Sequence, residues 1–396
     1  QDRLACNYWR ERCLASMRWF LLAASSIVLS WWVGRSLARG RRRKLRVHFL
    51  KKGHGGKSMV GWTPTDQHLH AICRKLSSDV LVTSGEDLPR NAVDVLVAAF
   101  PTRDQLLQVK DSIRALLVPF AGFPPPTRLL LKELGMSSKL VVCNLHHNAP
   151  MTAELAVALC LAASKQIFEA DRKLRQHDWS SRGIPCEGVP DPLPMLLLQG
   201  KVALVVGYGE VGQRVARIMS AFGMEVLATR ASLSRVARDK HAVVHPPADL
   251  LSLLPRANVV FLCVPLTSGT SKMLGRKELA MLPKGSVLVN VSRGEVVDED
   301  ALFEALSQRE NLFAAGIDTW YNYPATSKDT QSTPVSTRND FSKLTNLVMS
   351  PHRGGAVGLE ETESARLSAI AEALNLAADR SDVRAMPCRV DVERGY

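Results

Sequence analysis

From residue 45 onward, short apolar runs alternate with longer amphipathic stretches and polar connections. The runs are bounded by polar or turn-forming residues, which is typical of buried strands. In the first part of the chain the predicted strands are 45–50, 79–84, 94–100, 114–120 and 141–145. Helix-like stretches such as 65–76 lie between them, so the pattern predicts a parallel βα sheet.

The segment 151–176 has apolar residues at spacings of three and four, which predicts one long helix. A turn-rich loop, 177–194, follows it. The βα pattern then restarts, with predicted strands at 201–207, 224–230, 258–264, 286–291, 312–318 and 347–351. Six strands with interposed helices are typical of a doubly wound, Rossmann-type nucleotide-binding domain. The polar stretch 325–340 predicts a flexible surface insertion.

Three glycines, Gly207, Gly209 and Gly212, stand between the predicted strand 201–207 and the helix after it. A GxGxxG pattern in this context is typical of dinucleotide binding. The first glycine permits a tight turn, the second lets the backbone approach a pyrophosphate, and the third lets the helix pack on the sheet. The helix N-terminus adds free N–H groups. A glycine-rich structural turn is the alternative.

The predicted second strand of this domain ends at Arg230, and Ser232, Ser234 and Arg235 follow. An acidic residue that would bind the ribose hydroxyls of NAD(H) is not found at this strand end. Cations and hydroxyls suit a 2′-phosphate, so NADP(H) is favoured over NAD(H), which is still possible. The alternative is a solvated surface arginine.

A length of 396 residues predicts two domains, and 46% hydrophobic with 22% charged residues is ordinary for a globular protein. The formal net charge of +13 is concentrated in residues 1–50, which carry about +9 and leave about +4 for the rest. With no aromatic-basic platform, nucleic-acid binding is not expected. The eight cysteines form no CxxC pair and no metal cluster. They are interpreted as small buried residues of a reducing compartment.

The N-terminal stretch 19–34 is apolar for 16 residues and precedes the basic run 39–46. It is shorter than the roughly 20 residues of a membrane span. Three interpretations compete: a membrane anchor with its basic flank in the cytoplasm, a cleaved targeting segment with Ser36 and Ala38 near the cleavage site, and an upstream sequence that never folds. The expected location is therefore a cytoplasmic catalytic body that is anchored to a membrane or directed to an organelle.

Four further motifs follow in order: VPLTSGTSKMLG at 264–275, LPKGSVLVNVSRGEVVDEDAL at 282–302, AAGIDTW at 314–320 and SPHRGG at 350–355. In this order and spacing they resemble the D-isomer-specific 2-hydroxyacid dehydrogenases, over about residues 90–380. That family includes glyoxylate/hydroxypyruvate reductases, phosphoglycerate dehydrogenases and formate dehydrogenases. The motifs together are highly specific.

The resemblance implies a Rossmann domain inserted in a smaller flavodoxin-like α/β substrate domain. The predicted limits are 1–44 for a targeting or anchor segment, 45–150 and 356–396 for the substrate domain, and 151–355 for the dinucleotide-binding domain. The resemblance also implies a homodimer built partly on the predicted helix 151–176.

Arg293 and His352 each come just past the end of a predicted strand, where doubly wound sheets bind ligands. The resemblance implies that Arg293 binds the substrate carboxylate and keto oxygen, which suits a planar guanidinium. It implies that His352 donates a proton to the carbonyl oxygen as hydride arrives, and accepts one in reverse. An unrelated surface arginine and a structural histidine are the alternatives.

By the same resemblance, the backbone N–H groups of Ala121 and Gly122 hold the substrate carboxylate. Asn144, His146 and His147 lie near the cleft and receive no role. Asp318 is expected near the nicotinamide, and Pro265 and Thr270 along the cofactor. The predicted cofactor-binding residues are Gly207, Gly209, Glu210, Val211, Gly212, Arg230, Ser232, Val264, Pro265, Thr270, Val291, Ser292, Arg293, Asp318 and His352.

One position departs from the family pattern. The family has a catalytic glutamate five positions after the aspartate and one before a proline, and this chain has Tyr323 there, before Pro324. Tyr323 can orient an imidazole by hydrogen bonding but carries no charge at neutral pH. His352 is then expected to titrate near its ordinary pKa of ~6.5, and keto-acid reduction to fall as pH rises through about 6–7.

Three functions are compatible with these residues. The first is NADPH-dependent reduction of a small 2-keto acid such as glyoxylate or hydroxypyruvate. The second is a dinucleotide-sensing binding protein with little or no turnover, suggested by Tyr323 and the N-terminal segment. The third is formate oxidation, which needs no protonation step.

Overall fold

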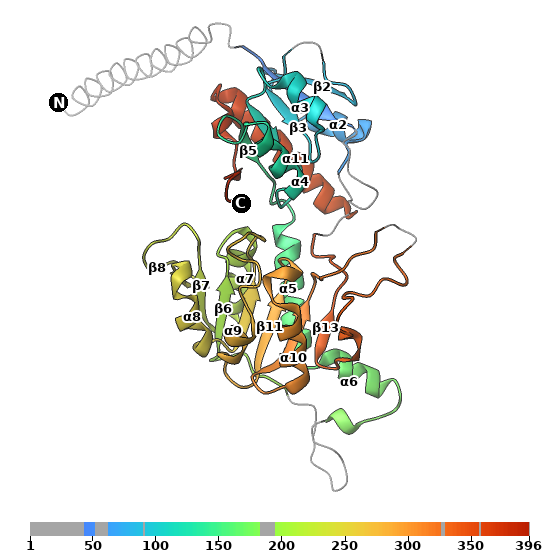
Figure 1. Ribbon diagram of the computed structural model, residues 1–396, viewed down its shortest axis with the longest axis vertical. Coiled ribbons are helices and arrows are strands. Elements are labelled where there is room, and N and C mark those ends of the chain that lie inside the picture. The colour runs from blue at the N-terminus through green and yellow to red at the C-terminus, as the bar shows by residue number, and fades with distance from the viewer. Residues whose placement is uncertain are drawn as a thin grey trace, which may run out of the picture. The chain divides into compact units, whose positions relative to one another are not determined.

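The computed structural model describes residues 43–51, 62–89, 92–182, 195–325, 329–355 and 358–395. Arg46–Tyr396 form one compact unit by their contacts, and this unit holds two separate sheets (Figure 1). The predicted anchor or targeting stretch 19–34 lies outside the described residues.

The first sheet has the strand order β14-β5-β4-β3-β1-β2. Strands β1, β3, β4 and β5 pair in parallel, whereas β14 is antiparallel to its neighbour β5. Its strands are β1 (Leu45–Leu50), β2 (Val80–Gly85), β3 (Val95–Val97), β4 (Ala115–Leu117), β5 (Val141–Cys143) and β14 (Arg389–Val390). Its helices are α2 (Asp66–Cys73), α3 (Arg103–Val109), α4 (Pro125–Glu133) and α11 (Glu360–Asp379).

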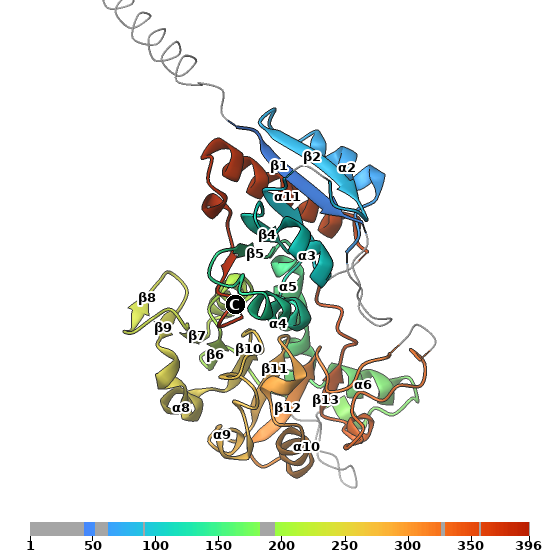
Figure 2. The ribbon, with the colours of Figure 1, turned by 45° about the horizontal axis from the view of Figure 1, so that its top comes forward.

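The end of the chain returns to this first sheet. Helix α11 packs against α2 and β2, although the whole second sheet lies between them in the sequence (Figure 2). The short strand β14 then pairs with β5. Strand β14 was not predicted from the sequence.

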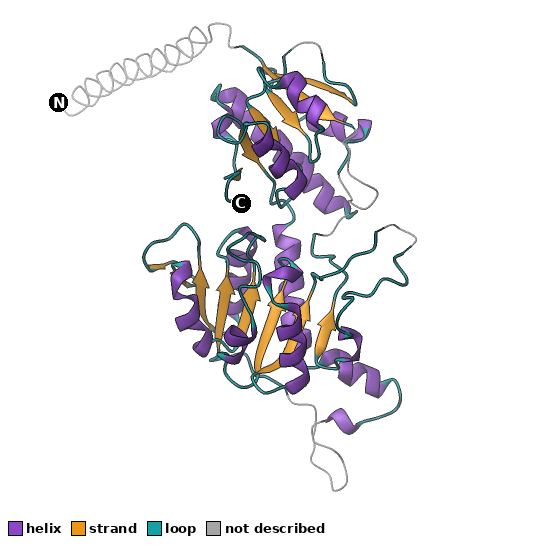
Figure 3. Cartoon of the chain, viewed as in Figure 1, coloured by secondary structure: helices purple, strands orange, loops and turns teal. Residues whose placement is uncertain are grey.

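The second sheet has the order β13-β12-β11-β10-β6-β7-β9-β8, parallel except for β8. Figure 3 shows helices alternating with these strands. The strands are β6 (Val202–Val206), β7 (Glu225–Thr229), β8 (Ala237–Arg238), β9 (Val243–His245), β10 (Val259–Leu262), β11 (Ser286–Asn290), β12 (Leu312–Ile317) and β13 (Leu347–Met349). The helices are α5 (Ala149–Ser164), α6 (Ile167–Leu174), α7 (Glu210–Ala221), α8 (Leu250–Leu253), α9 (Arg276–Ala280) and α10 (Glu299–Gln308).

The order reverses at β6. The chain runs from β6 outward through β7 and β9, then returns to place β10 on the other side of β6. This is the doubly wound arrangement, in which ligands bind outside the carboxyl ends of the strands at the reversal. All six predicted strands of this sheet are present, and the predicted fold class is confirmed. The short strands β8 and β9 were missed, and the exact domain limits stay a prediction.

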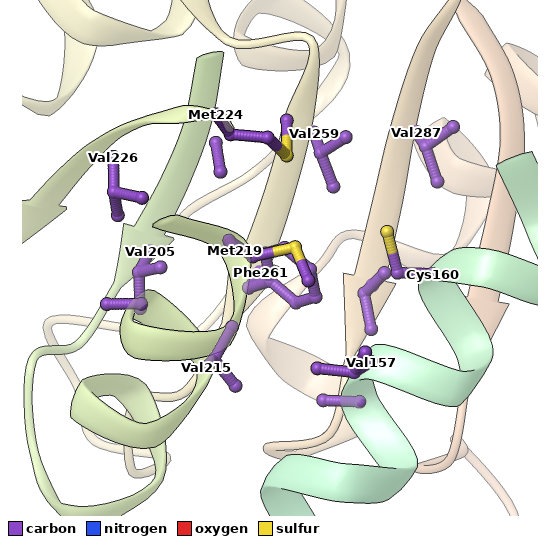
Figure 4. Packing of buried hydrophobic residues seen from close by; sticks show 14 of the residues in the cluster. Val157, Cys160, Val205, Val215, Met219, Met224, Val226, Val259, Phe261 and Val287 are labelled. Carbon is purple, nitrogen blue, oxygen red and sulfur yellow. The ribbon is translucent and has the colours of Figure 1, made fainter. Parts of the chain in front are cut away.

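Two apolar layers cover the two faces of the second sheet. Figure 4 shows Val157 and Cys160 of α5 gathered with Met219 of α7 and Phe261 of β10 in one layer. The other layer is formed by side chains of α8, α9 and α10. The central strands between the layers are mainly apolar and buried, as expected of a parallel sheet covered on both faces.

The predicted single helix 151–176 is wrong. It is divided into α5 and α6 at Gln166, whose φ of 51° is left-handed and which is buried. The two helices meet at 60°. Nine residues of α5 are buried in the core, whereas none of α6 is. Helix α6 carries the polar stretch EADRK, which matches its exposure.

Within the described residues, no single helix combines the length and the apolar character that crossing a membrane requires. The bent pair of α5 and α6 meets these two criteria only when taken together.

The predicted flexible insertion at 325–340 is tied down where the structure describes it. Val335 accepts backbone hydrogen bonds from Tyr321 at 3.3 Å and Asn322 at 3.0 Å. Ser336 donates to Glu299, and Arg338 pairs with Asp300, both in the first turn of α10. The described part of the insertion is therefore anchored on two sides.

Candidate active site

In the glycine loop after β6, one of the three glycines could carry a Cβ without contacting any other part of the protein. An ideal Cβ at Gly207, where φ is 102°, would lie 2.6 Å from the Cys263 carbonyl oxygen, and one at Gly212 would overlap the Gly207 carbonyl oxygen. A Cβ at Gly209 would meet nothing within 4 Å. Gly209 is the N-cap of the 12-residue helix α7. The space above Gly209 and the free N–H groups of the helix fit the pyrophosphate of a dinucleotide.

Glu210 and Val211, which open α7, belong to the same predicted set. Glu210 forms an ion pair with Arg214 one turn later at 2.6 Å, and Val211 packs against the core. Both side chains thus have partners within the protein. The backbone N–H groups of Glu210 and Val211 are the parts placed to face a phosphate.

Arg230 follows β7 directly and is exposed. Its backbone N–H donates to the His245 carbonyl at 3.0 Å, while its guanidinium makes no hydrogen bond or ion pair with the described residues. The Asp239 carboxylate accepts from the Tyr208 hydroxyl and from the His241 N–H. Arg230 acts on the pKa of Tyr208, which burial and then Asp239 raise and Arg230 lowers. Arg230 is therefore an exposed cation near Tyr208, whose hydroxyl already engages Asp239.

The loop after β10 closes on the glycine loop. The Thr270 hydroxyl donates to the Pro265 carbonyl at 2.6 Å and accepts from the Thr267 N–H at 2.8 Å. A Cβ at Gly207 would lie 2.9 Å from Cγ1 of Val264. Val264, Pro265 and Thr270 thus form a folded turn next to the predicted pyrophosphate site.

The turn that carries Arg293 is built by Asn290 at the end of β11. Asn290 accepts from the Ser292 N–H at 3.0 Å and from its hydroxyl at 2.7 Å, and donates to the Arg293 carbonyl at 2.9 Å. Gly294 must lack a side chain because a Cβ there would overlap the Trp320 carbonyl oxygen. Arg293 is therefore presented from a fixed turn. Sequence reasoning missed Asn290, although an amide between a strand and VSRG is a signal of such a turn.

Arg293 meets the predicted substrate loop. Its Nη1 donates to the Ser292 carbonyl at 2.6 Å, and its Nη2 lies 3.1 Å from where a Cβ of Gly122 would stand. Gly122 has a left-handed φ of 85°. Its N–H faces the Asn144 side-chain oxygen at 3.3 Å, and the Asn144 amide nitrogen lies 3.2 Å from the Cys388 carbonyl. The N–H expected to hold a substrate carboxylate therefore already has one protein acceptor.

The loop that carries His352 is held by Asp318, which is fully buried. Asp318 accepts from the Ser350 hydroxyl at 2.5 Å and from the N–H groups of Arg353 and Gly354 at 2.9 Å each. His352 sits in this loop with a left-handed φ of 55°. Both carboxylate oxygens of Asp318 thus position the histidine loop, a task that the resemblance did not assign. The expected contact of Asp318 with a nicotinamide stays a prediction.

Tyr323 lies beside His352, but in a different way from that expected. The two rings are 5.5 Å apart between centroids and inclined at 52°. The Tyr323 hydroxyl accepts from the Trp320 N–H at 2.9 Å. Trp320 is buried, and its indole N–H donates to the Ser350 carbonyl at 2.7 Å. Tyr323 therefore packs against the imidazole instead of hydrogen-bonding to it, because its hydroxyl is directed at the backbone.

Comparison with known proteins places these residues in a family. Residues 157–354, half of the chain, match the model of the D-isomer specific 2-hydroxyacid dehydrogenase NAD binding domain. The chain belongs to this family. Its second sheet is the NAD-binding domain, and the dinucleotide-sensor alternative has no support among the relatives.

Two relatives illustrate the match. A glyoxylate reductase of Thermococcus litoralis is 32% identical over 228 residues, which cover 56% of this chain and 63% of that protein. The chain spans about six tenths of the length of the glyoxylate reductases it matches. A D-isomer specific 2-hydroxyacid dehydrogenase of Xanthobacter autotrophicus, solved with NADPH and MES, has a TM-score of 0.66 at 19% identity. That match covers 89% of this chain and 100% of the other and shows the same fold.

In this chain the candidate proton donor, His352, is shifted toward its neutral form. Loss of solvation lowers the pKa of His352, the Arg293 guanidinium lowers it further, and the Asp318 carboxylate partly opposes them. The expectation of an ordinary pKa is therefore corrected downward. Partial burial raises the pKa of Tyr323, which stays neutral and offers no compensating charge.

The cysteines only partly match the expectation of small buried residues. Cys143 and Cys160 are buried, whereas Cys73 and Cys388 are exposed. In the part of the chain that the structure describes, no three His, Cys, Asp or Glu side chains are arranged to hold a metal ion.

Proposed function

We propose that this dehydrogenase reduces a small 2-keto acid, of the glyoxylate or hydroxypyruvate type, with NADPH. The observation that carries the proposal is the position of Arg293, which is next to the predicted substrate loop and close enough to His352 to act on its pKa. Its Nη2 lies next to Gly122 in the substrate loop, and its charge acts on His352. A carboxylate bound by Arg293 would place the neighbouring keto oxygen within reach of an acid.

Each residue then has a defined task. Arg293 binds the substrate carboxylate and polarises the keto group, while His352 gives its proton to the keto oxygen. The reduced nicotinamide supplies the hydride that adds to the carbonyl carbon when the cofactor is bound. In the reverse direction His352 removes the hydroxyl proton. Asp318 and Asn290 keep the two turns in place.

The preference for NADP(H) rests on Arg230. Its guanidinium is exposed and unpaired within the described residues, and Ser232 beside it is also exposed. A 2′-phosphate would receive charge-assisted hydrogen bonds there, whereas the ribose hydroxyls of NAD(H) would lack a carboxylate acceptor, since Asp239 is engaged by Tyr208.

The proposed substrate class rests on the names of the relatives and on the groups that the site residues can recognise. The Thermococcus litoralis protein is named a glyoxylate reductase. Arg293, Gly122 and His352 recognise only the carboxylate and the keto group, which every small 2-keto acid carries. Both the substrate side chain and the direction of the reaction in the cell are left open by these contacts.

We also propose a homodimer, built on α6 in the second half of the segment 151–176 rather than on its first half, α5. Most of α5 is buried in its own core, whereas α6 and the segments near it expose large apolar side chains. These are Ile167, Phe168, Leu174, Trp179, Met195 and Leu197, and we call them the apolar arm. Leu196 donates to the Ser164 carbonyl at 2.9 Å, which places the last two beside the junction of α5 and α6. Exposed apolar surface of this size marks an interface, and a second copy of the chain is its proposed occupant.

Attachment to a membrane or delivery to an organelle through residues 1–44 stays a prediction. Fractionation of cells that produce the full chain and a variant lacking these residues would test it. Equal distribution of both forms in the soluble fraction would contradict it.

The proposed reaction is tested by mixing purified protein with NADPH and glyoxylate and following NADPH absorbance. We expect oxidation of NADPH, and a loss of at least about 100-fold in kcat for His352→Ala. His70→Ala is the matched control, because His70 is exposed on α2. Tight NADPH binding without turnover across a panel of 2-keto acids would contradict the proposal and favour the sensor.

A further inference from the structure

Two connections join the two sheets. The outgoing connection, residues 144–152, leaves β5 and enters α5. The returning connection leaves β13 at Ser350, carries His352, and enters α11. In such an arrangement these two connections bear any movement of one sheet against the other. Contacts between them therefore affect where His352 stands.

Two side-chain hydrogen bonds link the connections. The Thr152 hydroxyl donates to the Gly354 carbonyl at 2.8 Å, two residues after His352. Further along, Nε of Arg366 donates to Nε2 of His147 at 3.2 Å. One of the two bonds lies beside the histidine loop, and the other lies at α11.

Arg366 is held firmly for this contact. It is 6% exposed, which is unusual for arginine, and its Nη1 pairs with Glu363 at 2.7 Å. The indole of Trp62 lies against the guanidinium at 5.5 Å and donates to the same Glu363 at 2.6 Å. Because the charge is paired and the plane is stacked, Nε–H has one direction left, toward His147.

The bond defines the state of His147. Arg366 can only donate, so Nε2 of His147 must accept, and the proton of the neutral ring lies on Nδ1. Nδ1 is buried and has no hydrogen-bond partner among the described residues. Burial, with a smaller effect of Arg366, lowers the pKa of His147 to about 4, so the ring is neutral at neutral pH. The bond from Arg366 is thus the one side-chain hydrogen bond that this half-buried ring makes within the described residues.

The helix start next to His147 needs such a fixed point. Asn148 is the N-cap of α5 but its side chain makes no capping hydrogen bond. The first turn of α5 then carries Thr152, which holds Gly354. Displacement of His147 would therefore be passed on to the loop of His352 through one helical turn.

We propose that His147 and Arg366 are positioning residues that brace the two connections, and so hold the His352 loop in place relative to Arg293 and the substrate loop. The effect on catalysis rests on the proposed function. The brace itself does not, because it is a property of the connections.

The test compares three variants of the full chain. His147→Phe keeps a planar ring but removes the acceptor, His147→Gln keeps an acceptor near the position of Nε2, and His146→Phe changes the neighbouring half-buried histidine. His146 makes no side-chain hydrogen bond within the described residues. Hydrogen–deuterium exchange of residues 144–152 and 358–366 is measured with kcat, KM and the Kd for NADPH.

We expect His147→Phe to increase exchange in both segments and to lower kcat about tenfold, as for loss of one buried hydrogen bond. The Kd for NADPH should stay within about twofold, and His147→Gln should recover most of kcat. If His147→Phe behaves like His146→Phe in both hydrogen–deuterium exchange and kcat, the proposal is overturned.

Two further outcomes are separable. If every form lacks turnover, the proposed function fails, and the exchange data still decide on the brace. If His147→Phe does not fold, Arg366→Lys replaces it, since lysine keeps the charge beside Glu363 but has no Nε–H at that place. Unchanged exchange in Arg366→Lys would then overturn the proposal.

Discussion

At the scale of single residues, Tyr323 changes what His352 can do. A carboxylate in contact with the imidazole would favour its protonated form, whereas the phenol packs against the ring and sends its hydroxyl to Trp320. Burial and the Arg293 charge then lower the pKa of His352. In the proposed reaction, the group that donates the proton is therefore shifted toward its neutral form.

The first prediction concerns pH. Only protonated His352 can donate, so kcat/KM for keto-acid reduction should be highest below the lowered pKa of His352 and fall as pH rises past it, below ~6.5. Tyr323→Glu should extend the active range upward by about one pH unit or more, because a carboxylate favours the imidazolium. The measurement is a pH profile of kcat/KM for both proteins.

Tyr323→Phe is the matched control, since it keeps the ring contact and adds no charge, and its profile should resemble that of the wild type. A rate for the wild type that stays flat to pH about 8.5 would show that His352 is not the titrating donor.

The second prediction concerns Arg230, whose guanidinium is unpaired in the described structure. Arg230→Ala should raise the Kd for NADPH about tenfold or more and leave the Kd for NADH nearly unchanged, because only the former has a 2′-phosphate. Arg217→Ala, an exposed change on α7, is the control. Equal weakening of both cofactors would place Arg230 outside the phosphate site.

At the scale of elements, the loop between β6 and α7 separates two uses of glycine. Gly207 and Gly212 are required by the protein, because a side chain at either would collide with backbone carbonyl groups. Gly209 is not, since a methyl group there would meet nothing within 4 Å. The same motif thus contains a folding requirement and a binding requirement that substitutions can tell apart.

The third prediction is the contrast between two alanine variants. Gly212→Ala should destabilise the fold by about 1–3 kcal/mol, seen as a lower Tm, because the added methyl overlaps the Gly207 carbonyl. Gly209→Ala should keep its Tm and weaken dinucleotide binding about tenfold or more, since the methyl would occupy the space of the pyrophosphate. Thermal unfolding and cofactor titration check both, and unchanged binding in Gly209→Ala would argue against a phosphate at this glycine.

At the scale of the whole molecule, the bend between α5 and α6 separates a buried helix from an exposed one. Helix α5 closes the core of the second sheet, while α6 displays an apolar face with no partner in the described part of the chain. The surface left by this division is the apolar arm.

The fourth prediction is that the apolar arm forms the dimer. Phe168, which is 62% exposed, should lie in the interface, so Phe168→Glu should yield monomers. Leu129→Glu is the control, because Leu129 is similarly exposed at 61% but lies on α4 of the first sheet. Light scattering after size exclusion gives the mass of each, and a monomeric wild type would refute the interface.

The sequence by itself determined the doubly wound sheet, the positions of its six predicted strands and the glycine loop. These depend on local periodicity and on residue types at fixed spacing, which the chain displays without knowledge of its folded partners. It also determined that Arg293 and His352 follow strand ends, because the carboxyl ends of parallel strands share one edge of a sheet. Family motifs alone sufficed to name the family.

Only the tertiary structure decided which atoms those residues meet. The helix breaks at Gln166, whose left-handed φ of 51° is not visible in the periodicity of the sequence. Three contacts join residues that are distant in the sequence. The ring of Tyr323 packs against His352, Asp318 holds the histidine loop, and Arg366 donates to His147. Such contacts are set by packing between elements, and packing is a property of the folded chain.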